Sequence, residues 1–258
     1  MNSISFDRAA DYYDQTRDLA EPVATHGLPA LLQLLSPRAG SRILDVGIGT
    51  GRIAVPLMKL GADVIGIDLS LKMMTKLRQK SPAVRIAQAD AARLPFADRT
   101  FDAALTTHVL HLIGPWRAAL HEIKRVIKPG GVYVNAWHHH HDRSVNQAVR
   151  DAWRERVRAH GVEWRRPDAQ LPEDMFAELK TLGHFEEIQL VQYQTTSTAA
   201  FELERIANRV MSEAWQVPDD IYARTLDETR EWALREFGDL DRSVVEDRHF
   251  IAQVVRFG

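Results

Sequence analysis

Residues 44–51 read Leu44-Asp45-Val46-Gly47-Ile48-Gly49-Thr50-Gly51, an apolar run that stops at a cluster of glycines. A short apolar run bounded by glycine is typical of a buried strand. Glycine has no Cβ, so the backbone at such a turn bends tightly and approaches a ligand closely. The stretch therefore predicts a strand that ends at a ligand-binding turn.

The same rhythm of strand and helix repeats along the first half of the chain. We expect strands at 42–46, 63–68, 84–88, 101–106 and 132–137, with helices at 51–60, 71–80 and 115–127. Strands that alternate with helices pair in parallel through right-handed crossovers, which gives a doubly wound α/β sheet. Ligands of such sheets bind at the carboxyl ends of the strands, so the glycine turn is expected at the binding site.

The flanking regions follow a different pattern. We expect helices at 6–18, 22–35, 143–160, 172–182, 199–214 and 218–237, and strands at 186–195 and 246–257. The last two strands lack a short crossover repeat, which favours an antiparallel edge on a mostly parallel, seven-stranded, Rossmann-like sheet. We expect N-terminal helices that cover the ligand site at 1–40, a binding core at 41–142, and a helical lid with the last two core strands at 143–258.

Composition narrows the class of protein. The 258 residues are 45% hydrophobic and 26% charged, which is typical of a globular protein. The formal net charge of -2 gives no overall attraction to nucleic acid or to anionic membranes. With no cysteine, disulfides, thiolate metal sites and cysteine nucleophiles are excluded. We expect a cytoplasmic monomer or homodimer with no nucleic-acid partner, membrane insertion or bound metal.

The glycine turn admits two kinds of ligand. Gly47-x-Gly49 resembles the start of the dinucleotide fingerprint, but Arg52 stands where that pattern has its third glycine. Asp68 ends the second expected strand, where a carboxylate accepts hydrogen bonds from both ribose hydroxyls. These residues indicate an adenosine-type ligand, and a nicotinamide cofactor stays open as an alternative.

Five segments in order resemble motifs of the class I S-adenosylmethionine-dependent methyltransferases. They are residues 43–52, 64–70, 88–96, 101–112 and 125–131. The resemblance is strongest to the small-molecule branch that includes the ubiquinone/menaquinone-pathway and biotin-pathway methyltransferases. It covers residues 43–137 and says little about 143–240.

The resemblance implies roles for individual residues around S-adenosylmethionine. Gly47 and Gly49 would lie along the methionine part, with the backbone near Thr107 facing it, and Asp45 would orient its amino end. Asp68 would hold the ribose, and Leu69 would pack on the adenine. The adenine edge would be read by Asp90 and Ala91.

The N-terminal segment resembles the short helix that precedes the core in this branch. Phe6, Tyr13 and Arg17 recur at helical spacing, so they are expected to share one face. Arg17 is able to pair bidentately with the carboxylate of the cofactor. The alternative is that Tyr13 and Arg17 only hold the segment against the core.

Methyl transfer from a sulfonium mainly requires alignment and exclusion of water, so an obvious catalytic residue is not expected. His108 and His111, after the fourth strand, are the candidates for a general base, and local packing is the alternative. His138–His141 are expected to form a polar loop with no metal. Arg150, Arg154 and Arg158 share a helical face, which we interpret as solvated and paired with Asp151 and Glu155.

The sequence thus predicts an enzyme that transfers a methyl group from S-adenosylmethionine to a small-molecule acceptor. Two alternatives are a protein that binds the cofactor without turnover and a nicotinamide-dependent oxidoreductase. The sequence alone does not indicate the acceptor, or whether carbon, oxygen or nitrogen is methylated.

Overall fold

The computed structural model describes residues 3–17, 19–36, 38, 40–140, 144–163 and 172–258, with the backbone alone at 139–140 and 172–173. The chain divides into two compact units. Unit 1 comprises Met1–His138, Pro167–Val191 and His249–Gly258, and unit 2 comprises His139–Arg166 and Gln192–Arg248. Each unit is described by itself, as far as its residues are described.

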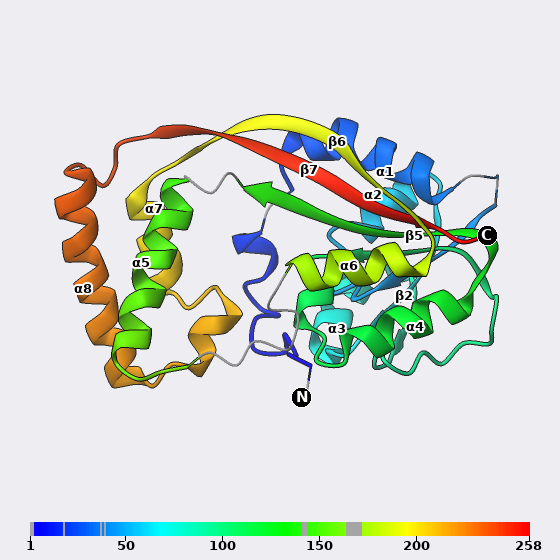
Figure 1. Ribbon diagram of the computed structural model, residues 1–258, viewed down its shortest axis with the longest axis horizontal. Coiled ribbons are helices and arrows are strands. Elements are labelled where there is room, and N and C mark those ends of the chain that lie inside the picture. The colour runs from blue at the N-terminus through cyan, green and yellow to red at the C-terminus, as the bar shows by residue number, and fades with distance from the viewer. Residues whose placement is uncertain (1–2, 18, 37, 39, 141–143, 164–171) are drawn as a thin grey trace. The chain divides into compact units, whose positions relative to one another are not determined.

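The strands form one seven-stranded sheet in the order β3-β2-β1-β4-β5-β7-β6 (Figure 1). Its strands are β1 (Arg42–Val46), β2 (Asp63–Asp68), β3 (Arg85–Gln88), β4 (Phe101–Thr107), β5 (Ile127–His140), β6 (His184–Ser197) and β7 (Val244–Arg256). The first five strands pair in parallel. The strand order reverses between β1 and β4, which makes their carboxyl ends the topological switch point.

The last two strands form the edge of the sheet beyond β5, as the sequence predicts. β7 is the antiparallel strand, and it lies between β5 and the edge strand β6. Contacts between β5 and β7 run in opposite directions along the chain: Gly131 O accepts from Phe257 N at 3.0 Å, and Asn135 donates to Gln253 at 2.9 Å. The arrowheads of β5 and β7 point in opposite directions in Figure 1.

Helices cover both faces of the sheet in unit 1. They are α1 (Leu28–Leu35), α2 (Ala54–Lys59), α3 (Leu71–Lys80), α4 (Trp116–Val126) and α6 (Pro172–Leu182). Successive strand residues face opposite ways. Leu44 and Ile67 accordingly join the apolar cluster of α4 and α6, whereas Val64 joins the cluster of α2 and α3. The five expected core strands and the helices between them are confirmed.

The expected N-terminal helix at 6–18 is wrong. Residues 7–13 form turns, and only Asp14–Thr16 form a short 3-10 helix. The acidic side chains of this segment bond to α3 and the glycine turn instead of lining a helix face. The expected helix at 22–35 contains a π-helix at Val23–Gly27 before α1. Pro29 has no N–H to donate, and the N–H of Leu28 bonds to Val23 O, five residues back.

Unit 2 is built mainly from three helices, α5 (Val145–Ala159), α7 (Ala199–Ala207) and α8 (Asp219–Phe237). Its apolar core contains Trp153, which is fully buried and packs edge-on to the Tyr222 ring with centroids 5.7 Å apart. The expected helix at 199–214 is two elements, α7 and a 3-10 helix at Ser212–Gln216. Within the described ranges, no helix has the length and apolar character needed to cross a bilayer.

Candidate functional site

The glycine turn after β1 adopts a conformation that requires glycine. Gly47 has φ +81°, and a Cβ there would lie 2.5 Å from Cγ2 of Val109. The N–H groups of Gly47 and Ile48 both donate to the carbonyl of Ile67, at 2.8 and 2.9 Å. The turn is therefore pulled against the end of β2, with Val109 closing its other side.

Asp68 connects this turn to the loop that follows β2. Its Oδ2 accepts from the N–H of Gly49 at 2.8 Å, and its Oδ1 accepts from the N–H of Ser70 at 2.8 Å. Burial raises the pKa of the Asp68 carboxyl, while these backbone hydrogen bonds lower it. The carboxylate is half-buried, and each oxygen keeps a lone pair with which to accept from a ligand hydroxyl.

A cavity of about 700 Å³, including its part open to solvent, lies at the carboxyl ends of β1, β2 and β4. This volume is within the range of small-molecule and cofactor sites. All but two of the predicted site residues line it: Tyr13, Arg17, Gly47, Gly49, Asp68, Leu69, Asp90, Ala91, Thr107 and His108. The cavity therefore gathers residues that are widely separated in the sequence at the switch point of the sheet.

The far end of this cavity is lined by residues that follow β2 and β3. Leu69 is 38% exposed, and Ala91 is buried. Asp90 is exposed, and its Oδ1 accepts from the N–H of Ala92 at 2.9 Å, which fixes the carboxylate in a tight turn. An apolar side chain and a carboxylate beside each other suit the face and the amino edge of an adenine.

Asp45 does not line the cavity. It lies in β1 between Gly66 of β2 and Leu105 of β4, and only 4% of it is exposed. Burial, together with the nearby Asp68 carboxylate, raises the pKa of Asp45 to about 7. A buried carboxyl with this pKa changes its charge readily when a cation comes close.

Phe6, Tyr13 and Arg17 lie together although their segment is not a helix. The two rings pack edge to face with centroids 6.0 Å apart. The guanidinium of Arg17 lies 4.6 Å from the Tyr13 centroid and 5.4 Å from the Phe6 centroid. All three residues line the cavity, so this cluster forms one of its walls.

Two acidic residues bind this N-terminal segment to the core. Oδ1 of Asp7 accepts from the hydroxyl of Ser70 at 2.5 Å and from the N–H of Lys72 at 3.3 Å. Asp14 accepts from the hydroxyl of Thr50 at 2.6 Å and forms an ion pair with Lys80. Because the Ser70 hydroxyl is the N-cap of α3, Asp7 adds a carboxylate as a further acceptor at the positive end of that helix.

His108 follows β4 and has φ +54°, a left-handed conformation that non-glycine residues rarely adopt. Its Nε2 lies 2.7 Å from Nδ1 of His138 on β5, and the two rings are nearly parallel, at 6°. Burial, with the charges of His138 and Arg52 next in importance, holds the pKa of His108 well below its usual value. His111 is exposed and does not line the cavity.

Thr107 carries a polar group that the protein leaves available. Its Oγ1 is buried and has no hydrogen-bond partner among the residues that the structure describes. Thr107 lines the cavity, as does its neighbour His108. A buried hydroxyl without a partner is costly unless a ligand satisfies it, so this atom fits a bound polar group.

Several lining residues have no signal in the sequence. Val109, Leu112 and Ile113 close the cavity after β4, and Met73 contributes from α3. These are apolar residues whose position depends on the turns around them. The pairing of His138 with His108 was also not predicted, because thirty residues separate the two histidines and no pattern links them.

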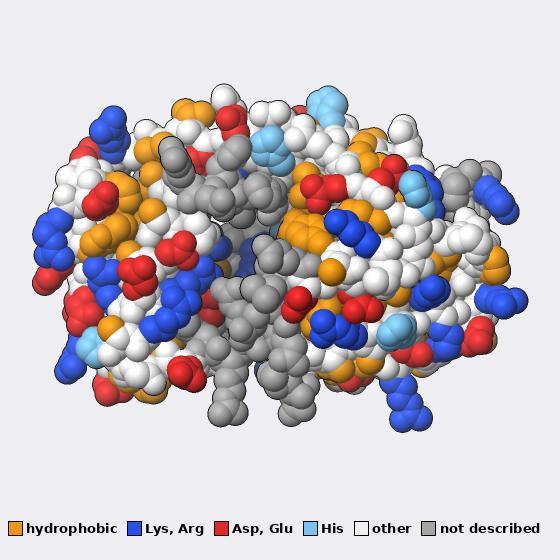
Figure 2. Space-filling model, in the orientation of Figure 1, with side chains coloured by type: hydrophobic (Ala, Val, Ile, Leu, Met, Phe, Trp, Pro, Cys, Tyr) orange, Lys and Arg blue, Asp and Glu red, His pale blue; other side chains and the backbone are white. Residues whose placement is uncertain are grey.

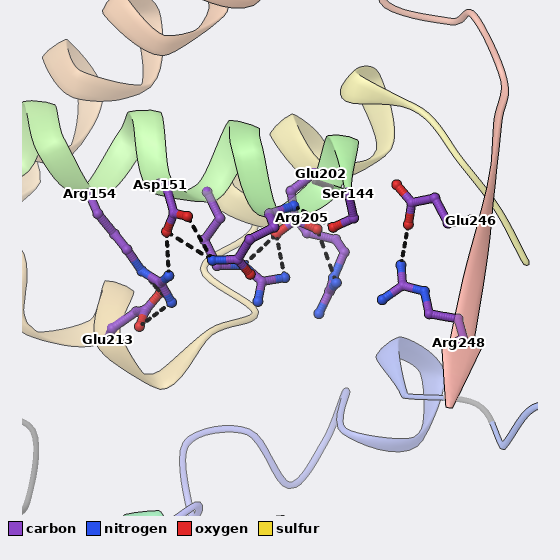
Figure 3. A network of polar contacts seen from close by, with 10 residues as sticks. Ser144, Asp151, Arg154, Glu202, Arg205, Glu213, Glu246 and Arg248 are labelled. Carbon is purple, nitrogen blue, oxygen red and sulfur yellow. Dashed lines mark hydrogen bonds and ion pairs between the residues drawn. The ribbon is translucent and has the colours of Figure 1, made fainter. Parts of the chain in front are cut away.

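The expected solvated arginine face of α5 is partly wrong. Arg154 does pair with Asp151 at 2.8 Å, as predicted. However, Arg150 binds the fully buried Glu202 of α7 at 2.9 Å. Arg154 also binds Glu213 at 2.8 Å, a pair that is drawn in Figure 3. The two arginines are 19% and 14% exposed at their side chains. They therefore belong to the packing of unit 2.

Two further expectations concern surface groups. His141 lies outside the described residues, as do the side chains of His139 and His140. Over the described ranges there is no group of three or more potential metal ligands. On the face drawn in Figure 2, basic and acidic side chains are interspersed.

Comparison with known proteins identifies the core. Residues 44–135 match the family model described as a methyltransferase domain. A demethylmenaquinone methyltransferase of Corynebacterium kroppenstedtii is 39% identical over 129 residues, which are 48% of this chain and 56% of that protein. A malonyl-[acyl-carrier protein] O-methyltransferase of Salmonella typhimurium is 36% identical over 130 residues, 50% of each chain.

The chain spans about half the length of the curated relatives it matches. A solved structure of a putative methyltransferase from Anabaena variabilis shares the fold, with a TM-score of 0.61 and 18% identity over 93% of this chain and 99% of that one. The sheet order, the glycine turn with Asp68, and the family match agree. Residues 44–135 are therefore similar to a methyltransferase domain.

Proposed function

We propose that the protein transfers a methyl group from S-adenosylmethionine to a small-molecule acceptor. The observation that carries this proposal is the cavity at the switch point of the sheet, where the glycine turn, Asp68 and Asp90 line one space. The matched family supports the same activity. Bound in this cavity, the sulfonium supplies an activated methyl group and a good leaving group.

The residues around the cavity fit this cofactor. Asp68 offers two carboxylate oxygens where a ribose would lie, and Asp90 with Ala91 offers an edge and a buried surface for adenine. Gly47 and Gly49 line the same cavity, so the backbone of the turn would lie along the methionine part of the cofactor. Arg17 and the hydroxyl of Thr107, which also belong to the lining, offer donors for a carboxylate or another polar group.

We propose that these residues act by binding, orienting and excluding water. In-line displacement requires the nucleophile and methyl carbon to be held close and aligned. Val109, Leu112 and Ile113 provide apolar walls near the end of β4, where an acceptor would approach. The names of the two relatives indicate quinone-type and malonyl-type acceptors for those proteins, and both are candidates for this chain.

Calorimetric titration with S-adenosylmethionine, S-adenosylhomocysteine and NAD tests the cofactor assignment. We expect the first two to bind and NAD to fail. Tight binding of NAD without binding of the sulfonium would favour the oxidoreductase alternative. Release of S-adenosylhomocysteine with a malonyl thioester or a naphthoquinol would then separate an enzyme from a protein that only binds the cofactor.

The substitution Asp68→Ala tests the ribose assignment. We expect cofactor affinity to fall about tenfold to a hundredfold, since the loss of hydrogen bonds to a charged group costs about 1.5–3 kcal/mol. Asp63→Ala is the matched control, because Asp63 lies at the other end of β2 and pairs with Arg85 at the surface. Equal affinities of the two variants by calorimetry would contradict the assignment.

A further inference from the structure

His138 and His108 form a pair whose hydrogens are determined by one backbone group. The N–H of His138 donates to Nε2 of His108 at 3.2 Å. A backbone N–H is always a donor, so Nε2 of His108 must carry a lone pair and no hydrogen. In a neutral imidazole the other nitrogen then holds the hydrogen, which makes His108 the Nδ1–H tautomer.

The same reasoning fixes the hydrogen on the partner ring. Nδ1 of His138 lies 2.7 Å from Nε2 of His108, a distance that requires one hydrogen between them. Since Nε2 of His108 has none, Nδ1 of His138 is the donor. The His138 ring is held in place by Phe250 on β7, whose ring centroid lies 4.9 Å away at 33°.

If Nε2 of His108 took up a proton, its N–H would point at two other donors, Nδ1–H and the backbone N–H of His138. The groups whose charge acts on His108 are His138 on β5, Arg52 after the glycine turn, His111 in the turn after β4 and Arg17 in the N-terminal segment. All of them are basic, and a positive His108 would be repelled by each when they are charged. His108 is thus unsuited to accept a proton from a substrate.

We propose that His138 is a positioning residue that holds His108 as a neutral Nδ1–H hydrogen-bond donor at the cavity wall, so that the methyl acceptor presents an oxyanion, a carboxylate or a phenolate. His108 lines the cavity next to Thr107, where a methyl acceptor would meet the methionine end of the cofactor. A donor and nearby cations favour an oxygen with negative charge.

The chemistry balances without a base. A bond forms between the acceptor oxygen and the methyl carbon while the bond from that carbon to sulfur breaks and its electron pair stays on sulfur. The acceptor loses its negative charge, the sulfonium loses its positive charge, and no proton moves. The methyl transfer to an acceptor oxygen rests on the proposed function, whereas the tautomers follow from the protein's own geometry.

Nuclear magnetic resonance of protein labelled with ¹⁵N-histidine tests the tautomers. His138→Asn keeps an N–H donor near the position of Nδ1, whereas His138→Phe keeps an aromatic ring and removes the donor. We expect His108 to be the Nδ1–H tautomer, without titration across neutral pH, in the wild type and in His138→Asn. In His138→Phe the backbone N–H of residue 138 still donates to Nε2, so we expect the Nδ1–H tautomer to remain, and the loss of the ring donor to raise the pKa of His108.

An Nε2–H or charged His108 in the wild type at neutral pH would overturn the assignment. Equal behaviour of the two variants would overturn the role of His138. His108→Asn identifies the His108 signals by their loss. Circular dichroism and the melting temperature show whether each variant is folded.

Titration with 1-naphthoate and 1-naphthylamine, in protein saturated with S-adenosylhomocysteine, tests the class of acceptor. These probes share one ring system and differ in charge. We expect naphthoate to shift the His108 Nδ1–H signal and to bind about tenfold more weakly to His138→Phe, the cost of weakening one charge-assisted hydrogen bond. No shift with naphthoate, or an equal shift with the amine, would overturn the oxyanion proposal.

The two proposals fail in different ways. If calorimetry detects no binding of S-adenosylmethionine or of S-adenosylhomocysteine, the proposed function fails. The tautomers of His108 and His138 are measured on the free protein, so that test does not depend on cofactor binding. If the cofactor binds but His108 carries its hydrogen on Nε2, the methyltransferase proposal stands and the role of His138 is rejected.

Discussion

Gly47 shows how a single residue decides the shape of the site. Gly47→Ala would combine the strain of a positive φ with a contact of 2.5 Å to Val109. We expect it to lower the free energy of unfolding by about 2–5 kcal/mol, the sum of backbone strain and overpacking. Urea unfolding of the purified variant measures this loss.

Gly61→Ala is the matched control for Gly47→Ala. Gly61 has φ +95°, and nothing lies within 4 Å of the position of its Cβ, so only backbone strain is expected. Adding Val109→Ala to Gly47→Ala should recover part of the loss. A cost at Gly61 equal to that at Gly47 would show that the contact with Val109 is unimportant.

Asp45 gives the protein a specific dependence on pH. Its folded pKa of about 7 lies above the ordinary value of 3.8 for an aspartate. Between these values the folded state holds a proton that the unfolded state has lost, so stability falls as pH rises through this window. We expect the stability of Asp45→Asn relative to wild type to increase as pH rises from the unfolded pKa to the folded pKa. The gain reaches a few kcal/mol, because each unit of pKa difference corresponds to about 1.4 kcal/mol.

Urea unfolding at several pH values measures this difference. Asp102→Asn is the control with the opposite sign, because hydrogen bonds from Lys128 and Arg42 lower the pKa of Asp102. Its carboxylate stabilises the fold above the unfolded pKa and loses that effect as pH falls through the folded pKa. Parallel stability curves for wild type and Asp45→Asn would contradict the burial argument.

At the residue scale, the sequence identified most of the cavity because its polar members follow strands. Asp68 and Asp90 come directly after apolar runs, and such positions meet at one edge of a parallel sheet. His111, the second candidate base, is exposed and does not line the cavity, and the backbone of His108 before it is left-handed. The partner of His108, His138, lies on a neighbouring strand.

The N-terminal segment illustrates the limits at the element scale. Helical spacing predicted that Phe6, Tyr13 and Arg17 lie together, and they do, but through turns. The expected helix failed because Asp7 and Asp14 bond to groups far along the chain, and no local pattern reports such contacts. The strands, in contrast, follow the periodic apolar runs closely, with β5 extended on both sides of the expected 132–137.

This segment forms a wall of the cavity, so its attachment should control cofactor release. Asp7→Ala removes the acceptor for Ser70 and Lys72, and the loss of a helix cap costs about 1 kcal/mol. We expect faster amide hydrogen exchange at residues 3–17 and a dissociation rate of S-adenosylhomocysteine raised about fivefold, as that cost implies. Stopped-flow fluorescence measures the rate.

Asp11→Ala is the control for this prediction. Asp11 pairs with Lys76 at 2.8 Å on the same segment, but its side chain is 85% exposed, and such pairs contribute little. Equal effects of Asp7→Ala and Asp11→Ala would show that charge in general, and not the cap on α3, attaches the segment.

At the scale of the whole molecule, the two units differ in how far the sequence explains them. Residues 44–135 of unit 1 match a known family, and local sequence patterns predict their alternating strands and helices. Unit 2 is joined by ion pairs between residues more than fifty positions apart, such as Arg150 with Glu202 and Arg154 with Glu213. No periodicity signals such pairs. The role of unit 2 as a lid stays a prediction.

Glu202 is the centre of that network and provides its test. The side chain is fully buried between Arg150 and Arg205, at 2.9 and 3.1 Å. Glu202→Gln leaves two guanidinium groups without their countercharge, which costs roughly 3 kcal/mol. We expect faster hydrogen exchange in α5 and α7 and a lower melting temperature of unit 2.

Glu231→Gln is the matched control, because Glu231 pairs with Arg235 at 3.9 Å with both side chains largely exposed. A triple variant, Arg150→Met with Glu202→Leu and Arg205→Met, separates charge from packing. Replacement of a whole buried ion cluster by apolar residues is often neutral or stabilising. Recovery in the triple variant would assign the loss in Glu202→Gln to uncompensated charge, whereas no recovery would assign it to the geometry that the ion pairs impose on unit 2.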